Sequence, residues 1–144
     1  YHGGSFKNYS YLIIKYMPRN KIKILLVEDD SFLLSMYATK FEMEGFKVVM
    51  AEDGEKAIRL AAKEAPDIIL LDIILPKVDG FEVLRQLKAN DQTAPIPVIL
   101  LTNLSQKEEI EKGLKMGAVD YLIKAHFMPS EVVEKIKKVL NSPR

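Results

Sequence analysis

Five short, largely apolar runs recur along this chain, and each is separated from the next by a segment with helical periodicity. The runs occupy residues 22–27, 47–50, 67–71, 98–101 and 119–123. Short apolar runs bounded by Gly, Pro and Asp residues are typical of β-strands. Strands that are apolar throughout are buried on both faces of a sheet, which favours a parallel sheet with helices on either side. The alternation therefore predicts a doubly wound α/β fold.

The segments between and after these runs predict five helices. They span residues 31–44, 55–64, a stretch after the Asp79-Gly80 turn, 106–116, and a last helix opened by Pro129 and Ser130. Apolar positions recur in them at helical spacing, and Gly45 and Gly117 are natural stops. With 144 residues the chain has room for one domain. We expect a five-stranded parallel sheet, (βα)5, in residues 21–141.

The two ends of the chain differ from this pattern. Residues 1–20 hold four of the six tyrosines and a Gly-Gly-Ser triplet. This segment is interpreted as a loose extension or a cloning remnant, with an aromatic arm that packs on the domain or on a partner as the alternative. Residues 142–144 are expected to be a tail.

Composition excludes several classes of function. The 21 basic and 20 acidic residues give a net charge of +1, which provides no electrostatic footprint for nucleic acid or an anionic membrane. No apolar run approaches the roughly 18 residues of a membrane span. The absence of cysteine excludes disulfides and thiolate metal sites. We therefore expect a cytoplasmic protein without direct nucleic-acid or membrane binding.

Polar residues follow four of the five predicted strands, and these are the candidates for chemistry. They are Glu28 and Asp29 after the first strand, Asp72 after the third, Thr102 after the fourth and Lys124 after the fifth. The carboxyl ends of parallel strands share one edge of the sheet, so these side chains should meet there. Crowded carboxylates repel one another, and a divalent cation such as Mg²⁺ relieves the conflict.

This group of residues suits phosphoryl transfer. Asp72 ends a rigid strand and could attack phosphorus to form an acyl phosphate. The metal and Lys124 would offset charge, and the Thr102 hydroxyl could donate to a phosphoryl oxygen. Each residue also has an ordinary structural interpretation. Asp72 and Thr102 could be turn or capping residues, the acidic run could cap the first helix, and Lys124 could be solvated.

Several motifs occur in order at spacings that resemble the receiver domains of two-component response regulators. They are Val27-Glu28-Asp29-Asp30, Leu71-Asp72 with Leu75-Pro76 and Asp79-Gly80, then Thr102, then Asp120-Tyr121-Leu122-Ile123-Lys124. The resemblance implies a flavodoxin-like fold and a phosphoprotein that acts in signalling or a phosphorelay. A sensor histidine kinase or phosphotransfer protein would donate the phosphoryl group, with Mg²⁺ or Mn²⁺ as the cofactor.

The resemblance also implies a role for each matching residue. Asp72 is the phosphoryl acceptor, and Asp29 binds the metal with help from Glu28, Asp72 itself and the backbone carbonyl of Ile74. Thr102 and Lys124 contact the phosphoryl group, so they are the catalytic residues. Thr102 and Tyr121 form the switch, in which the aromatic ring swings inward. A downstream protein or a second copy would bind the face of the fourth helix, fifth strand and fifth helix.

Two positions depart from the family pattern. Ala125 follows the lysine where the family usually has proline, often after a cis bond, so we expect a trans path here because a cis bond before a non-proline residue costs about 2.5–4 kcal/mol. Asn103 follows Thr102 where the family favours a small residue. It could narrow access to the pocket or add a polar contact there. Apolar Ile74 and Leu104 predict a slowly hydrolysed acyl phosphate.

Two other functions fit the sequence less well. A phosphatase of the haloacid-dehalogenase type also uses Asp and Mg²⁺, but it typically carries a second Asp where Ile74 stands. A scaffold that dimerises without phosphorylation would not need the acidic, acceptor and lysine positions, all of which are kept. We therefore expect a domain that catalyses only its own phosphorylation and dephosphorylation and is otherwise not an enzyme.

Overall fold

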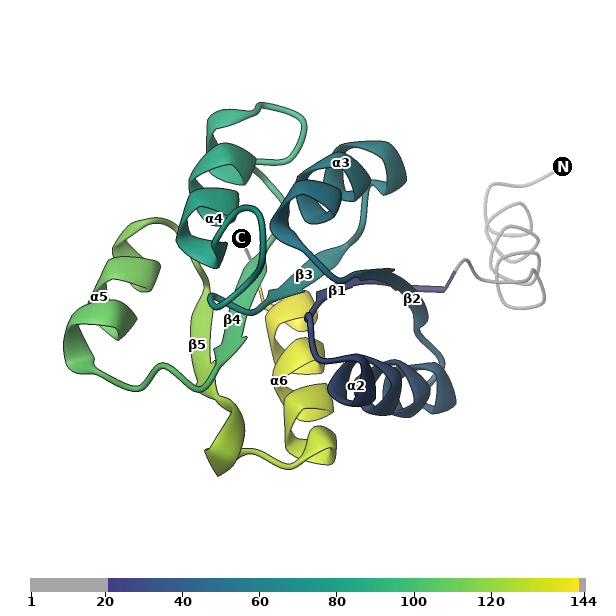
Figure 1. Ribbon diagram of the computed structural model, residues 1–144. Helices are drawn as coiled ribbons and strands as arrows, with labels where there is room; N and C mark the ends of the chain where they lie inside the picture. The colour runs from purple at the N-terminus through teal and green to yellow at the C-terminus, as the bar shows by residue number, and fades with distance from the viewer. Residues whose placement is uncertain (1–20, 143–144) are drawn as a thin grey trace, which may run out of the picture.

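The computed structural model describes residues 21–142 (Figure 1). The strands are β1 (Lys23–Val27), β2 (Lys47–Ala51), β3 (Ile68–Leu71), β4 (Val98–Thr102) and β5 (Asp120–Ile123). The helices are α2 (Ser31–Met43), α3 (Gly54–Glu64), α4 (Gly80–Ala89), α5 (Lys107–Lys115) and α6 (Pro129–Asn141), with a short 3₁₀ helix, η1 (Lys124–His126). The interpretation of residues 1–20, and all of the expected tail except Ser142, lie outside the described residues.

The five strands form one parallel sheet in the order β2-β1-β3-β4-β5, which confirms the predicted doubly wound fold. Consecutive neighbours are in register, with Val27 level with Leu71 and Leu71 level with Leu100. The chain winds in one direction from β1 to β2 and in the other from β3 to β5. The strand order therefore reverses at β1 and β3, and sites in such sheets form beyond the carboxyl ends of the strands at that point.

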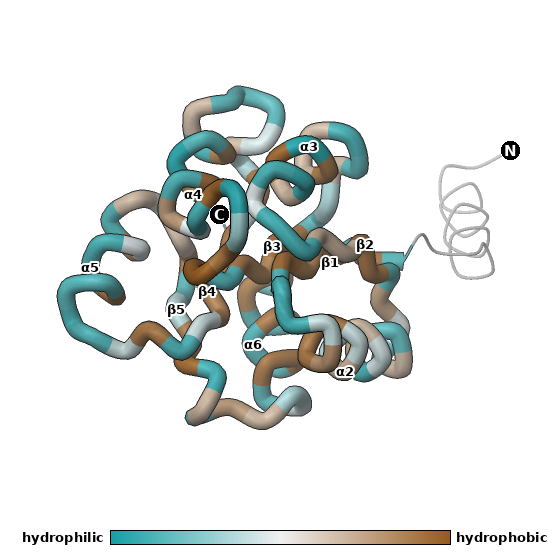
Figure 2. Tube along the Cα trace, viewed as in Figure 1, coloured by the Kyte–Doolittle hydropathy of each residue, from teal (hydrophilic) through white to brown (hydrophobic). Residues whose placement is uncertain are grey.

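Helices cover both faces of the sheet (Figure 1). On one side α2 and α6 pack over a core that includes Phe41 and Ile136. On the other side α3, α4 and α5 cover a second core that includes Leu84 and Leu100. Much of the sheet is coloured as hydrophobic in Figure 2, and β3 and β4 are buried along their whole length. Burial on both faces explains why these strands are continuously apolar.

Most predicted boundaries shift by one residue, and capping decides where α3 and α4 begin. Asp53 and Asp79, predicted as turn residues, are the N-caps of α3 and α4, and their side chains accept hydrogen bonds from backbone N–H groups of the first turn. Asp30 caps α2 in the same way. Thr102 is the last residue of β4 and does not follow it, and Val119 precedes β5. No helix within residues 21–142 is long and apolar enough to cross a membrane.

Candidate active site

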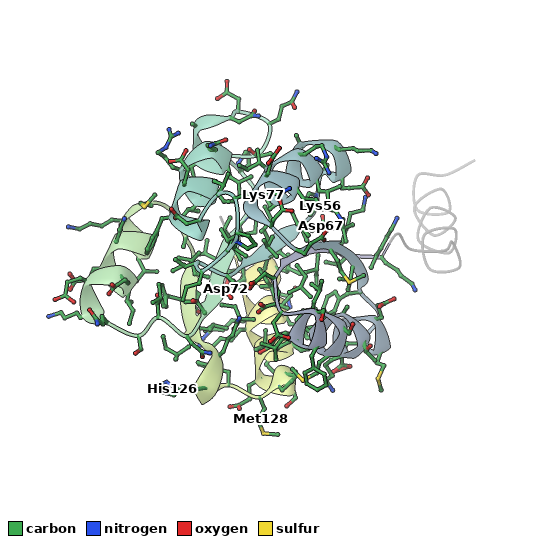
Figure 3. The ribbon with its side chains drawn as sticks, in the orientation of Figure 1. Lys56, Asp67, Asp72, Lys77, His126 and Met128 are labelled. Carbon is green, nitrogen blue, oxygen red and sulfur yellow. The ribbon has the colours of Figure 1, made fainter. Side chains whose placement is uncertain are left out.

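The carboxyl ends of β1 and β3 place two acidic side chains next to each other. Val27 and Leu71 are paired in register, so the residues that follow them, Glu28 and Asp72, emerge side by side. Asp72 lies near the middle of the view in Figure 3, between the two helical layers. Both residues are buried, at 3% exposed for Glu28 and 6% for Asp72. Two carboxylates are thus held out of water, which requires a compensating positive charge.

Lys124 supplies this charge from the end of β5. Its Nζ donates to Asp72 Oδ2 at 2.7 Å and also to Glu28 Oε1. The Lys124 side chain is only 10% exposed, so the ion pairs are poorly screened. The remaining carboxylate oxygens are also engaged. The Asp30 N–H donates to Glu28 Oε2 at 3.0 Å, and the Ile74 N–H donates to Asp72 Oδ1 at 3.3 Å. The Asp72 carboxylate is therefore fixed from two sides.

Burial and ion pairing act in opposite directions on the pKa values of these groups. Burial raises the pKa of the Glu28 carboxyl above its ordinary value, although the hydrogen bond and charge of Lys124 oppose the shift. Burial by itself would lower the pKa of Lys124. The hydrogen bonds to Asp72 and Glu28 outweigh that effect, and the pKa of Lys124 is raised. Lys124 thus remains an ammonium ion at neutral pH.

The acidic side chains also fit a divalent cation. One carboxylate oxygen each from Glu28, Asp29 and Asp72 lies within 4.8 Å of the other two. Asp29 is exposed while the other two are buried, so the cluster opens to solvent on the Asp29 side. Hard oxygen donors with room for water are what Mg²⁺ and Mn²⁺ prefer. The donor set therefore fits the predicted metal. The predicted contribution of the Ile74 carbonyl stays a prediction.

Thr102 stands at the end of the neighbouring strand and is completely buried. Its Oγ1 accepts a hydrogen bond from the Leu104 N–H at 3.4 Å. A hydroxyl that accepts one hydrogen bond can still donate its own proton to another group. Thr102 is paired in register with Ile123, the residue before Lys124. The hydroxyl and the ammonium group therefore come from adjacent strand ends.

Tyr121 is half-buried on β5, and its ring is held by the loop after β4. Its hydroxyl donates to the Leu104 carbonyl oxygen at 2.8 Å. On α5 the absence of a side chain at Gly113 makes room for the ring, because a Cβ at that position would lie 3.3 Å from Tyr121 Cδ2. The Tyr121 ring thus lies between α5 and the loop after β4, and its predicted role in a switch stays a prediction.

We expect Tyr121 to lose its proton only at high pH. Burial, together with the charges of Glu109 and Asp72, raises the pKa of its hydroxyl from 10.0 to about 12. An alkaline titration followed by tyrosinate absorbance should show a late step that Tyr121→Phe removes. Because the folded state favours the neutral phenol, its contribution to the free energy of unfolding is fully present below pH 10. That contribution is lost as the pH rises toward 12. If the step that Tyr121→Phe removes lay near pH 10, this prediction would be contradicted.

The two departures from the family pattern are in contact with each other. Residues 21–142 contain no cis peptide bond, so the bond between Lys124 and Ala125 is trans. The Ala125 N–H donates to Asn103 Oδ1 at 3.2 Å. Asn103 thus makes a polar contact with the turn after β5. His126, the next residue but one after Lys124, is exposed at the rim of the domain (Figure 3).

Comparison with known proteins places this arrangement in a family. Residues 24–137 match the response regulator receiver domain. The chain is a response-regulator receiver domain. It is 42% identical over 123 residues to the DNA-binding dual master transcriptional regulator RpaA of Synechocystis, covering 85% of this chain and 48% of RpaA. It is 41% identical over 120 residues to the alkaline phosphatase synthesis transcriptional regulatory protein PhoP of Bacillus subtilis, covering 82% of this chain and 48% of PhoP.

Solved receiver structures have the same fold. The receiver domain of the sensor histidine kinase PA1611 from Pseudomonas aeruginosa superposes with a TM-score of 0.78 at 30% identity, over 85% of this chain and all of that one. That receiver has a magnesium ion coordinated in its active-site cleft. The present chain spans about half the length of the two curated relatives. As a member of this family, the chain is a phosphoacceptor domain of two-component signalling.

Sequence reasoning placed Glu28, Asp72 and Lys124 at one sheet edge, but the exact partners of two contacts there came only from the structure. The double ion pair of Lys124 depends on the direction of a long side chain, which no spacing rule predicts. The Asn103–Ala125 hydrogen bond was signalled only by the coincidence of two unusual residues in two loops. Both loops end at the same sheet edge, so a contact between them could have been considered.

Proposed function

We propose that Asp72 of this receiver accepts a phosphoryl group from a histidine kinase or phosphotransfer protein. The observation that carries the proposal is the fixed, buried Asp72 carboxylate beside two further carboxylates and an ammonium group. An Asp72 oxygen forms the bond to phosphorus while the bond between phosphorus and the donor's leaving group breaks. The electron pair of that bond departs with the donor, and an acyl phosphate remains on Asp72.

Glu28, Asp29 and Asp72, with the Ile74 carbonyl, would hold the divalent cation. When bound, Mg²⁺ or Mn²⁺ neutralises charge on the transferring group and helps to orient it. When Asp72 bonds to phosphorus, its ion pair with Lys124 must weaken to make room for the phosphoryl group. Lys124 is long and remains charged, so it can follow the phosphoryl oxygens, and Thr102 can donate its hydroxyl proton to one of them. The positions of these side chains at adjacent strand ends support the proposed roles.

We further propose that Thr102 and Tyr121 transmit the phosphorylated state to the surface of α5, β5 and α6. The hydrogen bond from Tyr121 to Leu104 links β5 to the loop that begins at Thr102. Movement of Thr102 toward a phosphoryl group would therefore bias the position of this loop and of α5 after it. The partner on this face would be a downstream protein or a second copy of the domain.

A phosphatase that acts on external esters has less support. Ile74 occupies the position where such an enzyme needs a general acid, and its apolar side chain is 60% exposed. The domain is proposed to catalyse only its own phosphorylation and dephosphorylation.

Intact mass after incubation with acetyl phosphate and Mg²⁺ tests this function. We expect a gain of one phosphoryl group in the wild type, no gain in Asp72→Asn, and no gain when EDTA removes the metal. Asp79→Asn is a matched control because Asp79 is a helix cap outside the site, and it should still be phosphorylated.

A gain on Asp72→Asn, or a gain that resists EDTA, would contradict the proposed acceptor or the metal requirement. If the wild type does not react, beryllofluoride binding measured by NMR is the deciding experiment. Failure of both assays with folded protein would overturn the proposal and favour a phosphorylation-independent scaffold.

We expect the acyl phosphate to be hydrolysed slowly. Ile74 and Leu104 line the same surface pocket of about 610 Å³ beside the Asp72 loop, and their apolar side chains would hinder an attacking water. Loss of phosphorylated protein after removal of the donor can be followed by mass. Replacing Leu104 with asparagine should speed hydrolysis several-fold, whereas Leu114→Asn on the far side of α5 should not. A wild-type lifetime of only seconds in excess Mg²⁺ would contradict this prediction.

A further inference from the structure

Two neighbouring hydrogen bonds join the loop after β4 to β5 and the turn that follows it. Tyr121 donates to the backbone of Leu104, and the Ala125 N–H donates to the side chain of Asn103. Asn103 directly follows Thr102, and Ala125 directly follows Lys124. The second bond therefore links the chain neighbours of the two residues that are proposed to contact the phosphoryl group.

This bond needs a residue other than proline at position 125 and a side-chain acceptor at position 103. Proline has no backbone N–H, so a proline at position 125 could not donate to Asn103. A small apolar residue at position 103 would offer no side-chain acceptor. Each departure from the family pattern is chemically explained by the other, because Asn103 supplies the oxygen and Ala125 supplies the hydrogen.

We propose that Asn103 is a positioning residue for phosphorylation, acting through its hydrogen bond to Ala125. The bond fixes the loop after Thr102 relative to the turn after Lys124. The Thr102 hydroxyl and the Lys124 ammonium group are thereby held in one relative position for contact with the phosphoryl group. This inference rests on the proposed function of Asp72, Thr102 and Lys124. Groups that are held before the reaction lower the entropic cost of reaching its geometry.

A purely steric role for Asn103 predicts the opposite sign. If the side chain only narrowed the entrance, shortening it would speed phosphorylation whatever residue stood at position 125. If Asn103 acts through Ala125, shortening it slows phosphorylation, and the effect disappears once the Ala125 donor is gone. The sign and the dependence on position 125 separate the two roles.

A double-mutant cycle on the full chain tests the inference. We would measure the phosphorylation rate with acetyl phosphate and Mg²⁺ for the wild type, Asn103→Ala, Ala125→Pro and the double variant. Loss of one exposed hydrogen bond should slow Asn103→Ala about two- to fivefold. The double variant should be no slower than Ala125→Pro, because the bond can be lost only once. Ala125→Ser keeps the N–H and should stay within about twofold of the wild type.

The Ala125 amide provides a readout that does not depend on phosphorylation. In NMR spectra of the metal-free protein, Asn103→Ala should shift the Ala125 amide proton upfield and speed its exchange with solvent. Asn103→Asp keeps an acceptor oxygen and should preserve the protection. If Ala125→Pro fails to fold, the Ala125 amide signal together with the rate of Asn103→Ala decides the question.

The outcomes distinguish this inference from the function on which it rests. A wild type that is phosphorylated, with an Asn103→Ala variant that is equally fast or faster, would overturn the positioning role alone. Additive slowing in the double variant would do the same. If the wild type accepts no phosphoryl group, beryllofluoride affinity replaces the rate in the same cycle. A wild type that binds no beryllofluoride either would overturn both proposals.

Discussion

Replacing Lys124 with methionine is expected to lower the free energy of unfolding of the metal-free protein by about 3 kcal/mol. The substitution keeps most of the apolar stem but removes the charge that pairs with Glu28 and Asp72. Both carboxylates would then remain buried, close together and uncompensated, which is far more costly than losing an exposed ion pair. Urea unfolding in EDTA measures the change.

Two further measurements test the electrostatic origin of this effect. Mg²⁺ should restore part of the stability of Lys124→Met, because a cation among the same carboxylates replaces the missing charge. Lys135→Met is the matched control. Its Nζ lies 3.7 Å from Asp120 Oδ2, but both side chains are about one-third exposed, so the cost should stay below about 1 kcal/mol. Equal costs for the two lysines would contradict the prediction.

The pH dependence of this difference has a defined sign. The folded state raises the pKa of Lys124 above its ordinary value of 10.5. The stabilisation by Lys124 is therefore fully present below pH 10.5 and is lost as pH rises through the higher folded-state pKa. The gap in stability between wild type and Lys124→Met should narrow in that alkaline range.

Replacing Gly80 with alanine is expected to destabilise the domain by more than about 2 kcal/mol and to slow phosphorylation at least tenfold. A Cβ on Gly80 would lie 2.3 Å from the Asp72 carbonyl oxygen and 2.4 Å from Ile73 Cα. Both are backbone atoms, so no side-chain rotation relieves the overlap. The start of α4 or the loop that carries Asp72 must move, and the carboxylate of Asp72, the proposed acceptor, moves with that loop.

Gly113→Ala is the control for a glycine replaced inside a helix of the same domain. Its Cβ would meet Leu100 Cδ1 at 2.4 Å and Tyr121 Cδ2 at 3.3 Å, and both are side-chain atoms, which can shift more easily than backbone. The higher helix propensity of alanine, about 1 kcal/mol, offsets part of the repacking. We expect a smaller loss of stability and of phosphorylation rate than in Gly80→Ala. Unfolding curves and acetyl phosphate rates for both variants test the contrast, and a Gly80→Ala protein with wild-type rates would refute it.

The sequence alone was enough to predict the fold and which charged side chains gather at one edge of the sheet. Short strands without polar residues can be buried only between two helical layers, which leaves a parallel sheet as the favoured arrangement. A parallel sheet then brings Glu28, Asp72 and Lys124 to one edge, whatever the details of packing. The prediction succeeded because both steps depend on strand direction and residue type, which local patterns record.

The contacts that tune the site were decided only by the tertiary structure. Capping, which involves side-chain hydrogen bonds, placed the starts of α3 and α4 within the predicted turns, directly after Asp53 and Asp79. Lys124 pairs with Glu28 and Asp72, and Asn103 bonds to Ala125; each of these contacts joins residues 22 or more positions apart in the sequence. The close approach of Gly80 to the Asp72 backbone spans only a short loop. Such contacts are set by distances of a few ångströms between separate segments. Periodicity and spacing determine which residues meet at an edge, but only the packed chain determines which atoms touch.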